Sequence, residues 1–161
     1  MPAFRRLKDK EVKGLLRDLN RTYPSTGSLR SANNFDELSI GEHAVYFIDG
    51  APLIVRSKIG LMPSLKYDEA ISSLPHIVVD MGAVAHVANG ANIMRPGVRR
   101  IDGDFGKGEL VVIVDEKYSK PIAIGRSEVD STEMRLIGKG QVVENVHYVG
   151  DELWRSFVRP S

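Results

Sequence analysis

The sequence predicts an α+β protein in which a small N-terminal α/β domain is followed by a small C-terminal β-barrel. An amphipathic segment near the start and an Asp-Gly turn between two apolar runs indicate the mixed first domain. The second half consists of short apolar runs separated by Gly and Pro turns, which is typical of small barrels. Pro75 ends a helical pattern, so we place the boundary there, with domains at residues 1–75 and 76–161.

The first domain is expected to begin with a helix over residues 8–20, where apolar residues recur at helical spacing. Lys10, Lys13 and Arg17 fall on or near the opposite face. This basic face is either an ordinary solvent-exposed surface or a contact with ribosomal RNA. Residues 22–34 are rich in Ser, Thr, Gly and Asn and are expected to form a loop.

The remaining elements of this domain are expected to be strands and one short helix. A hairpin is predicted around Asp49-Gly50, because this dipeptide between two apolar runs is a strong turn signal. The expected elements are a strand or turn at 35–40, strands at 44–48, 52–57 and 59–65, and a helix at 67–74.

The second domain is expected to be mostly β. The apolar run at 109–115 is continuous, which indicates a strand buried on both faces. Asp130 is expected to cap a short helix over 130–137, with Glu133 three residues later. The other expected strands lie at 77–79, 92–101 (interrupted by Pro96-Gly97), 121–126 and 141–149.

Residues 77–97, IVVDMGAVAHVANGANIMRPG, form the most informative segment. A strand, a sharp turn stabilised by Asp80, a short helix over 83–89 and a second turn are expected in that order. Gly90 follows the helix, where a residue tolerant of positive φ is needed. Small residues allow close approach to the backbone, and several arginines follow. This combination favours binding of a phosphate backbone over catalysis.

Composition excludes several classes of protein. The formal net charge is +1, so this is not a polycation, although the first 30 residues are basic on balance. The absence of cysteine excludes disulfides and thiolate chemistry. No apolar run approaches the roughly 20 residues that span a membrane, and no signal peptide is recognisable. We therefore expect a cytoplasmic protein without membrane contact.

Catalytic patterns are incomplete. Residues 103–108, GDFGKG, lack the spacing and the hydroxyl residue of a P-loop. The histidines show no paired ligand spacing, and His147 is expected to serve packing or hydrogen bonding. No nucleophile with a base, or paired carboxylate, is evident. The sequence thus predicts no enzyme, no catalytic residue, no cofactor and no metal site.

Two blocks carry a resemblance to a known family. Residues 79–98 match V-D-x-G-A-V-x-x-V-x-x-G-A-N-I-M-x-P-G-V, which resembles the signature of the PUA domain. Residues 138–154, GKGQVVENVHYVGDELW, resemble the closing segment of the malignant-T-cell-amplified-sequence proteins, a PUA subfamily of translation reinitiation and recycling factors that includes archaeal relatives. Trp154 in this block is expected to be buried, anchoring the C-terminal tail.

The resemblance implies a pre-PUA α/β domain at 1–75 and an RNA-binding PUA pseudobarrel at 76–161. It also implies that the protein acts in translation on the small ribosomal subunit. In eukaryotic members the partner carries a start-codon-fidelity (SUI-type) domain, which makes such a factor an implied partner here. The ligand would be structured RNA, either ribosomal RNA or tRNA.

In similar PUA domains the short helix and the strand after it form the RNA-facing groove. By position, the groove residues are Gly82, Ala83, Gly90, Ala91, Asn92, Ile93 and Met94, of which Ile93 and Met94 are of a type more often found in the core. Arg95, Arg99 and Arg100 flank the groove, and arginine suits phosphate and base stacking. Lys139, between two glycines, is the further candidate. The alternative is that the small residues only serve turns and packing and that the charges are an ordinary solvated face.

We therefore predict an RNA-binding protein that recognises shape and backbone, because A-form RNA hides its base edges in a deep groove. The main rival is an RNA-binding accessory to tRNA or rRNA modification acting in trans. A third interpretation is a protein-interaction module. An RNA binder should show a positive patch beside Arg95 to Arg100, a modifying enzyme a cleft with perturbed carboxylates, and an interaction module an exposed apolar patch.

Overall fold

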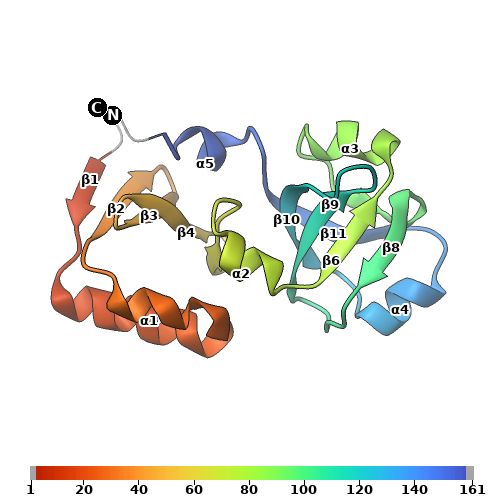
Figure 1. The fold of residues 1–161 in the computed structure, drawn as a ribbon. Coiled ribbons are helices and arrows are strands. Elements are labelled where there is room, and N and C mark those ends of the chain that lie inside the picture. Colours follow the sequence, from red (N-terminus) through yellow and green to blue (C-terminus); the bar gives the residue numbers. More distant parts are fainter. Residues whose placement is uncertain (1–2, 159–161) are drawn as a thin grey trace. The chain divides into compact units, whose positions relative to one another are not determined.

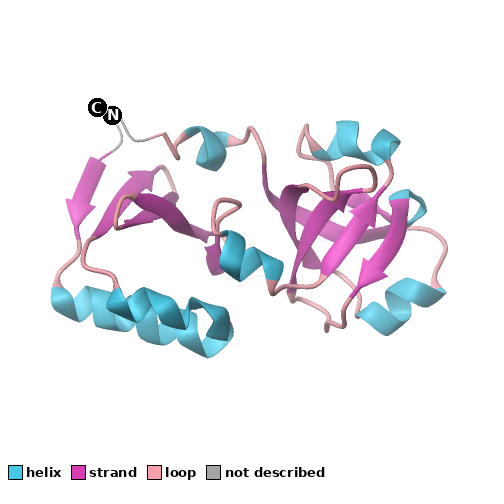
Figure 2. Ribbon diagram, in the orientation of Figure 1, coloured by secondary structure: helices cyan, strands magenta, loops and turns pink. Residues whose placement is uncertain are grey.

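The computed structural model describes residues 3–158, which divide into two compact units. The first unit comprises the chain up to Ser73 together with the segment from Arg155, and the second comprises Leu74–Trp154. Each contains a β-sheet and helices (Figures 1 and 2), as expected for an α+β protein. That residues 1–75 and 76–161 fold as separate domains stays a prediction.

The first unit is a five-stranded antiparallel meander in which each strand pairs with the next along the chain. Asp49 and Gly50 both have positive φ in the tight turn between β3 and β4, which confirms the predicted hairpin. The elements are β1 (Ala3–Arg6), α1 (Asp9–Thr22), the 3-10 helix η1 (Pro24–Ser31), β2 (Phe35–Ile40), β3 (His43–Ile48), β4 (Ala51–Ser57), β5 (Gly60–Pro63) and α2 (Asp68–Ser72).

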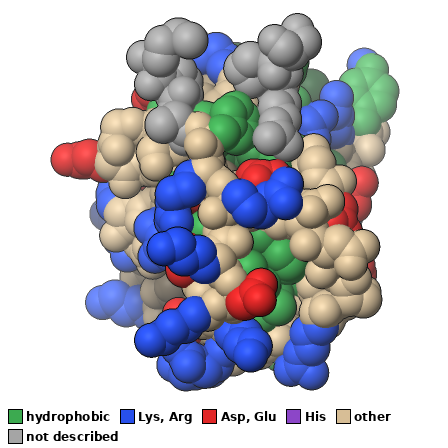
Figure 3. Space-filling model, turned by 90° about the vertical axis from the view of Figure 1, so that its left-hand side faces the viewer, with side chains coloured by type: hydrophobic (Ala, Val, Ile, Leu, Met, Phe, Trp, Pro, Cys, Tyr) green, Lys and Arg blue, Asp and Glu red, His purple; other side chains and the backbone are tan. Residues whose placement is uncertain are grey.

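Helix α1 confirms the predicted amphipathic helix. Leu15 and Leu19 are buried in the core of this unit, whereas Lys10, Lys13 and Arg17 are exposed. Figure 3 shows one face of the molecule, and Lys and Arg side chains gather on it where α1 lies. The helix therefore presents a basic surface to solvent.

The prediction of a loop over residues 22–34 was wrong, because η1 occupies most of it. Pro24 begins this 3-10 helix with a preset φ. Thr26 is fully buried and its hydroxyl donates to the Tyr23 carbonyl over 2.7 Å, while Leu29 packs in the core. Polar composition suggested a loop, but hydroxyl bonds to the local backbone and one buried leucine organise the segment instead.

Strand β1 was not predicted. It pairs antiparallel with β2 at the edge of the sheet. Its two consecutive arginines conceal any alternation of apolar and polar residues. Arg5 donates to Glu11 over 2.8 Å and Arg6 to Asp36 over 2.7 Å, so acidic partners from α1 and β2 hold this edge in place.

The second unit has a six-stranded sheet in the order β7-β11-β10-β9-β6-β8, in which β6 and β9 run parallel. The two edge strands, β7 and β8, are joined by only three residues, so the sheet must curl back on itself. This topology confirms the predicted pseudobarrel. The elements are β6 (His76–Val79), α3 (Met81–Val87), β7 (Ile93–Met94), η2 (Arg95–Gly97), β8 (Val98–Asp102), β9 (Leu110–Asp115), β10 (Pro121–Ser127), α4 (Ser131–Leu136), β11 (Gln141–Tyr148) and α5 (Glu152–Arg155).

The barrel core is apolar and dominated by β-branched side chains from several strands. All six residues of β9 are buried, which confirms the inference from its continuous apolar run. The Asp130 carboxylate accepts from the Glu133 N–H over 2.7 Å at the start of α4, as its sequence pattern predicts. Fully or nearly fully buried core residues include Ile77, Val79, Val111, Ile113, Ala123 and Val143.

Asp151 organises the end of the second unit. Its carboxylate accepts hydrogen bonds from Trp154 N–H over 2.7 Å and Tyr148 N–H over 2.9 Å, and lies 2.8 Å from the Nδ1 of His147. His147 is fully buried, so its predicted hydrogen-bonding role is confirmed. The expectation that Trp154 is buried was wrong: it is half-buried, because Leu153 is the residue that the short helix α5 directs inward.

Asp151→Asn is expected to lower the free energy of unfolding by about 1–3 kcal/mol at neutral pH, because charge-assisted bonds to buried groups are lost. Burial raises the pKa of Asp151, but the hydrogen bond and charge of His147 and the two backbone N–H groups outweigh it and leave the pKa below its ordinary value. The aspartate therefore stabilises the fold above its unfolded pKa of about 4, and this contribution is lost as pH falls through the lower folded pKa.

Urea denaturation of both proteins between pH 2 and 7 would measure this effect. The difference in stability should be largest at neutral pH and should shrink in acid. A constant difference across the whole range would show that the ionised carboxylate is not what stabilises this segment.

Candidate nucleic-acid interface

Helix α3 is fixed at both ends by residues of the 77–97 segment. The Asp80 carboxylate accepts from the Ala83 N–H over 2.7 Å, so Asp80 is the N-cap. The helix consequently begins at Met81, two residues earlier than expected, and Gly82 lies within it rather than in a turn. Gly90 has a φ of +88°, which confirms that the chain needs glycine just after this helix.

Small residues allow α3 to approach the η2 turn closely. A Cβ on Gly97 would lie 3.0 Å from the Cβ of Ala83, closer than side chains normally pack. The Asp80 N–H also donates to the Gly97 carbonyl over 2.9 Å. The residues of the predicted signature therefore do have a structural role, in that they join the helix to the turn that precedes β8.

An apolar groove of about 350 Å³ lies between α3, β7 and the η2 turn. Met94 is half exposed in it, with 50% of its surface accessible, while Ile93 is buried at 2%. The groove can therefore accept a flat apolar face, such as that of a nucleobase, against aliphatic and thioether groups. Its lining residues are Asp80, Ala83, His86, Val87, Ala91, Asn92, Ile93, Met94, Pro96 and Gly97.

Hydrogen bonds of Asn92 and Asn145 hold the wall of the groove in place. The Asn92 Oδ1 accepts from the Asn145 N–H over 2.9 Å, and its Nδ2 donates to Gln141 over 3.2 Å. The Asn145 Nδ2 in turn donates to the carbonyls of Val87 and Ala91 over 3.2 and 3.1 Å. These bonds attach the segment after α3 to β11. The side-chain oxygen and nitrogen of Asn92 therefore both form hydrogen bonds within the protein.

Arg99 and Arg100 both face solvent because β8 contains a bulge. Val98 pairs with Val79 and Arg100 pairs with Val78, which leaves Arg99 as an extra residue on this strand. Strict alternation would have turned one of the two arginines inward. Arg99 lies 3.2 Å from Glu116, and Arg100 lies 2.8 Å from Asp102.

Arg95 differs from these two arginines, because its guanidinium is bound to the protein backbone. Its Nε donates to the Met134 carbonyl over 2.7 Å and its Nη1 to the Val98 carbonyl over 3.2 Å. The residue is half-buried and links η2 to α4 and β8. Arg95 therefore both holds this corner of the barrel and leaves a positive charge at its surface.

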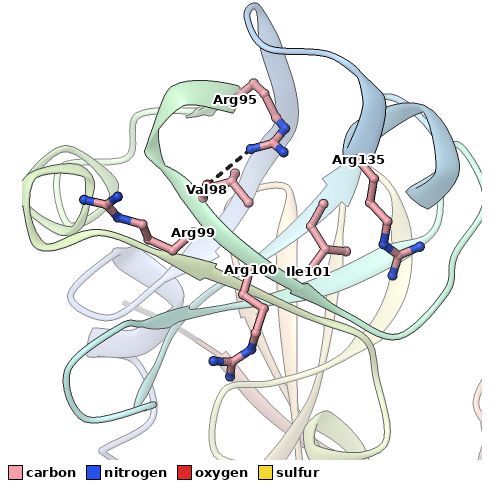
Figure 4. A pocket seen from close by; sticks show the side chains of 6 residues that line it. All are labelled: Arg95, Val98, Arg99, Arg100, Ile101 and Arg135. Atoms are coloured by element: carbon pink, nitrogen blue, oxygen red, sulfur yellow. Dashed lines mark hydrogen bonds between the residues drawn. The ribbon is translucent and has the colours of Figure 1, made fainter.

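These arginines line a second, smaller pocket of about 150 Å³ together with Arg135 of α4. Figure 4 shows the four guanidinium groups spread around Val98 and Ile101. Sequence reasoning missed Arg135, since it lies in a different helix far along the chain. The Arg135 fork donates to Asp104 over 3.1 Å and to the Gly103 carbonyl over 2.8 Å.

Arg100 and its partner Asp102 stabilise each other's charged form. The hydrogen bond that Arg100 donates to Asp102 raises the pKa of Arg100 and, despite the opposing effect of burial, lowers the pKa of Asp102. Both groups thus remain ionised. Four arginines thus line this pocket, and three of them are each paired with one acid. That this surface contacts RNA stays a prediction.

The structure separates nine of the predicted site residues into three sets. Ala83, Ala91 and Asn92 line the groove, and Arg95, Arg99 and Arg100 line the arginine pocket. Gly82, Gly90 and Lys139 line neither of them. Gly90 instead packs on the ring of Tyr148, which a Cβ at that position would meet at 3.1 Å. Lys139 is exposed in the turn before β11.

Two further findings concern residues 3–158. No cluster of three or more His, Asp or Glu side chains within this range is arranged to hold a metal ion. None of the helices in the same range has the length and apolar character that a membrane span requires.

The curled sheet, the helix-capped groove and the signature define a class of protein. The family model described as PUA domain matches residues 75–149. PUA domains are RNA-binding modules, and the pseudobarrel of the second unit corresponds to this match. A PUA domain from Aeropyrum pernix K1 has the same fold, with a TM-score of 0.82 and 28% identity over 96% of this chain and 90% of that one.

Relatives of known sequence extend the match to the first unit. An uncharacterized protein of Methanocaldococcus jannaschii is 30% identical over 92% of this chain and 93% of its own. Translation machinery-associated protein 20 of Saccharomyces cerevisiae is 35% identical over 68% of this chain and 65% of its own length. The chain belongs to this family of PUA-domain proteins, which also includes malignant T-cell-amplified sequence 1 of Rattus norvegicus, 33% identical over 50% of this chain and 46% of its own.

Proposed function

We propose that this protein binds structured RNA in translation, by contacting ribosomal RNA of the small subunit. The observation that carries the proposal is that the apolar groove and the arginine pocket meet at the η2 turn, where Arg95 lines one and Pro96 and Gly97 line the other. The short η2 segment thus borders both an apolar surface and a set of guanidinium groups. A nucleotide has the same division into an apolar base and a charged phosphate.

The two surfaces supply different parts of the interaction. Bases stack on apolar and planar groups without regard to sequence, at about 1–3 kcal/mol per base on an aromatic platform and less on aliphatic ones. Arginine binds phosphate through its planar fork, and each neutralised phosphate releases counterions, so the affinity depends on salt. The activity proposed is therefore binding by shape and backbone, with no reaction step.

The place in translation rests on the relatives. The yeast relative is named for the translation machinery, and it aligns with both units of this chain. We infer a cytoplasmic protein that associates with the small ribosomal subunit, in initiation, reinitiation or recycling, with a SUI-type factor as its protein partner. The basic face of α1 provides a second surface for ribosomal RNA or for that partner.

Co-sedimentation with purified small ribosomal subunits over a salt series tests the proposal directly. Binding should weaken steeply with salt and should be reduced by competing tRNA. Retention of free tRNA without any binding to subunits would replace the ribosomal proposal with the role of an accessory to RNA modification. Binding to neither would exclude RNA binding and leave a protein-interaction module.

Met94→Glu is expected to weaken binding to small subunits about tenfold while leaving the fold intact. The side chain is half exposed, so the substitution disturbs little packing, but it places a negative charge where a base and its phosphate would lie. Sedimentation at several salt concentrations measures the effect.

Tyr118→Glu provides the matched control, since Tyr118 is 70% exposed and lies outside the groove. It adds the same charge to the same unit and should bind like the wild type. Equal weakening by both variants would mean that the groove is not the contact and that only net charge matters.

A further inference from the structure

Arg135 joins three arginines from another part of the chain in one pocket. Arg99 and Arg100 come from β8, Arg95 precedes them in η2, and Arg135 comes from α4 (Figure 4). A hydrogen bond fixes α4 beside η2: Arg95 donates to the carbonyl of Met134, the residue before Arg135, over 2.7 Å. The position of α4 on the barrel therefore determines that Arg135 reaches this pocket.

The lining of the pocket is positive, and the acids lie outside it. The six lining residues are the four arginines with Val98 and Ile101. Glu116, Asp102 and Asp104 each bind one arginine but do not line the pocket. Arg95 donates to two backbone carbonyls, and no carboxylate among residues 3–158 forms an ion pair with it, so it adds a positive charge to the pocket.

The ion pairs between these arginines and their acids are partly or largely exposed to solvent. The side chains of Arg99 and Arg100 are 64% and 63% exposed. Those of their partners Glu116 and Asp102 are 35% and 44% exposed, and Asp104 is 91% exposed. Exposed ion pairs of this kind contribute little and compete with solvent. A phosphate group offers the same oxygen geometry with a higher density of acceptors, and several arginines can bind it at once.

We propose that Arg95, Arg99, Arg100 and Arg135 form a binding site for one phosphate group of an RNA backbone. On binding, the phosphate replaces Glu116 and Asp102 as the partner of the β8 arginines, while Arg95 stays fixed by its carbonyl bonds. The inference rests on the proposed RNA-binding function and deepens it. Because η2 borders both pockets, an RNA that binds this phosphate site can also reach the apolar groove.

The first experiment detects the anion itself. The Nε–Hε resonances of the arginines are followed by NMR during titration with inorganic phosphate, with ionic strength held constant by KCl. Saturable shifts are expected at the four pocket arginines and not at Arg126, which is paired with Glu144 elsewhere on the barrel. Uniform small shifts at all arginines would overturn the site.

The second experiment measures RNA binding with Arg135→Gln and a matched control. Arg126→Gln is that control, because both side chains are 42% exposed and each is paired with one acid. Fluorescence anisotropy with a labelled tRNA transcript over a KCl series gives the slope of log affinity against log salt. Arg135→Gln should reduce the magnitude of this slope by up to about 0.7–0.9, the value of the whole phosphate contact, because three arginines of the site remain. Arg126→Gln should leave the slope unchanged.

Two further variants separate charge from structure. Arg135→Lys keeps the charge and should retain most of the salt slope, which a purely structural role of the Arg135 fork would not allow. Glu116→Gln releases Arg99 from its competitor and should tighten tRNA binding by up to about fivefold, since an exposed ion pair is worth no more than that factor.

The outcomes distinguish this inference from the function on which it rests. Equal slopes for Arg135→Gln and Arg126→Gln, with wild-type binding intact, would overturn the phosphate site and leave the RNA-binding function standing. Phosphate shifts without any effect of Arg135→Gln on tRNA would show an anion site that RNA does not use, and would also overturn it. Absence of wild-type binding to both tRNA and small subunits would overturn the two together.

Discussion

Arg99→Glu combined with Arg100→Glu is expected to lower the affinity for small ribosomal subunits on the order of 100-fold at low salt. Two exposed cations become anions, and an unfavourable pair of charges at contact distance is worth about 1 kcal/mol even in bulk water. The fold should survive, because both side chains face solvent and are 64% and 63% exposed. Sedimentation over a salt series, together with thermal denaturation, measures both effects.

The matched control changes the same number of charges elsewhere on the second unit. Lys107 and Lys120 are exposed and line neither the groove nor the arginine pocket. Lys107→Glu combined with Lys120→Glu should therefore weaken binding only slightly, through net charge. If the two double variants lose affinity equally, or if Arg99→Glu with Arg100→Glu binds like the wild type, β8 is not the RNA contact.

Gly125→Ala is expected to destabilise the second unit by about 2–3 kcal/mol, the upper part of the range for overpacking a core. The glycine lies at a bulge where β10 pairs with β11. A Cβ there would lie 2.3 Å from the Cγ1 of Val143 and 2.8 Å from the Glu144 carbonyl oxygen. Both distances are far shorter than van der Waals contact. Because the second is to a backbone oxygen, which cannot rotate away, the two strands would have to separate.

Gly138→Ala is the control for this prediction. A Cβ on Gly138 would meet nothing within 4 Å, and its φ is not in the left-handed region. This variant should unfold within about 0.5 kcal/mol of the wild type in urea. If Gly125→Ala were as stable as Gly138→Ala, the close packing of β10 on β11 would not limit the size of residue 125.

The structural variants and the RNA-binding variants affect different parts of one unit. Gly125 and Asp151 govern strand packing and the end of the second unit, whereas Met94 lies in β7 and the pocket arginines lie in η2, β8 and α4. A loss of RNA binding with unchanged stability can therefore be assigned to the surface. The arrangement also explains why the small residues of the signature matter: they bring α3 and η2 together, and these elements form the walls of the groove.

Local patterns were sufficient to predict many of the elements. The periodicity of α1, the Asp49-Gly50 turn, the continuous apolar run of β9 and the cap at Asp130 each depend on residues close together in the chain. The same holds for Gly90, whose positive φ follows from its place after a helix. The prediction of a loop over residues 22–34 was wrong because the 3-10 helix in this segment depends on the burial of Leu29 against other elements.

Patterns along the chain were enough to predict the class of fold, the family and the segment that contains the groove, because each pattern consists of neighbouring residues, such as 79–98 and 138–154 for the family. Which charges lie together depends instead on the tertiary structure. Arg135 lies near Arg95 because Arg95 donates a hydrogen bond to the carbonyl of Met134, which is 39 residues further along the chain than Arg95. Arg99 and Arg100 share one face only because pairing with β6 creates a bulge. Register and long-range contacts depend on how strands pack together, and no local pattern in the chain records them.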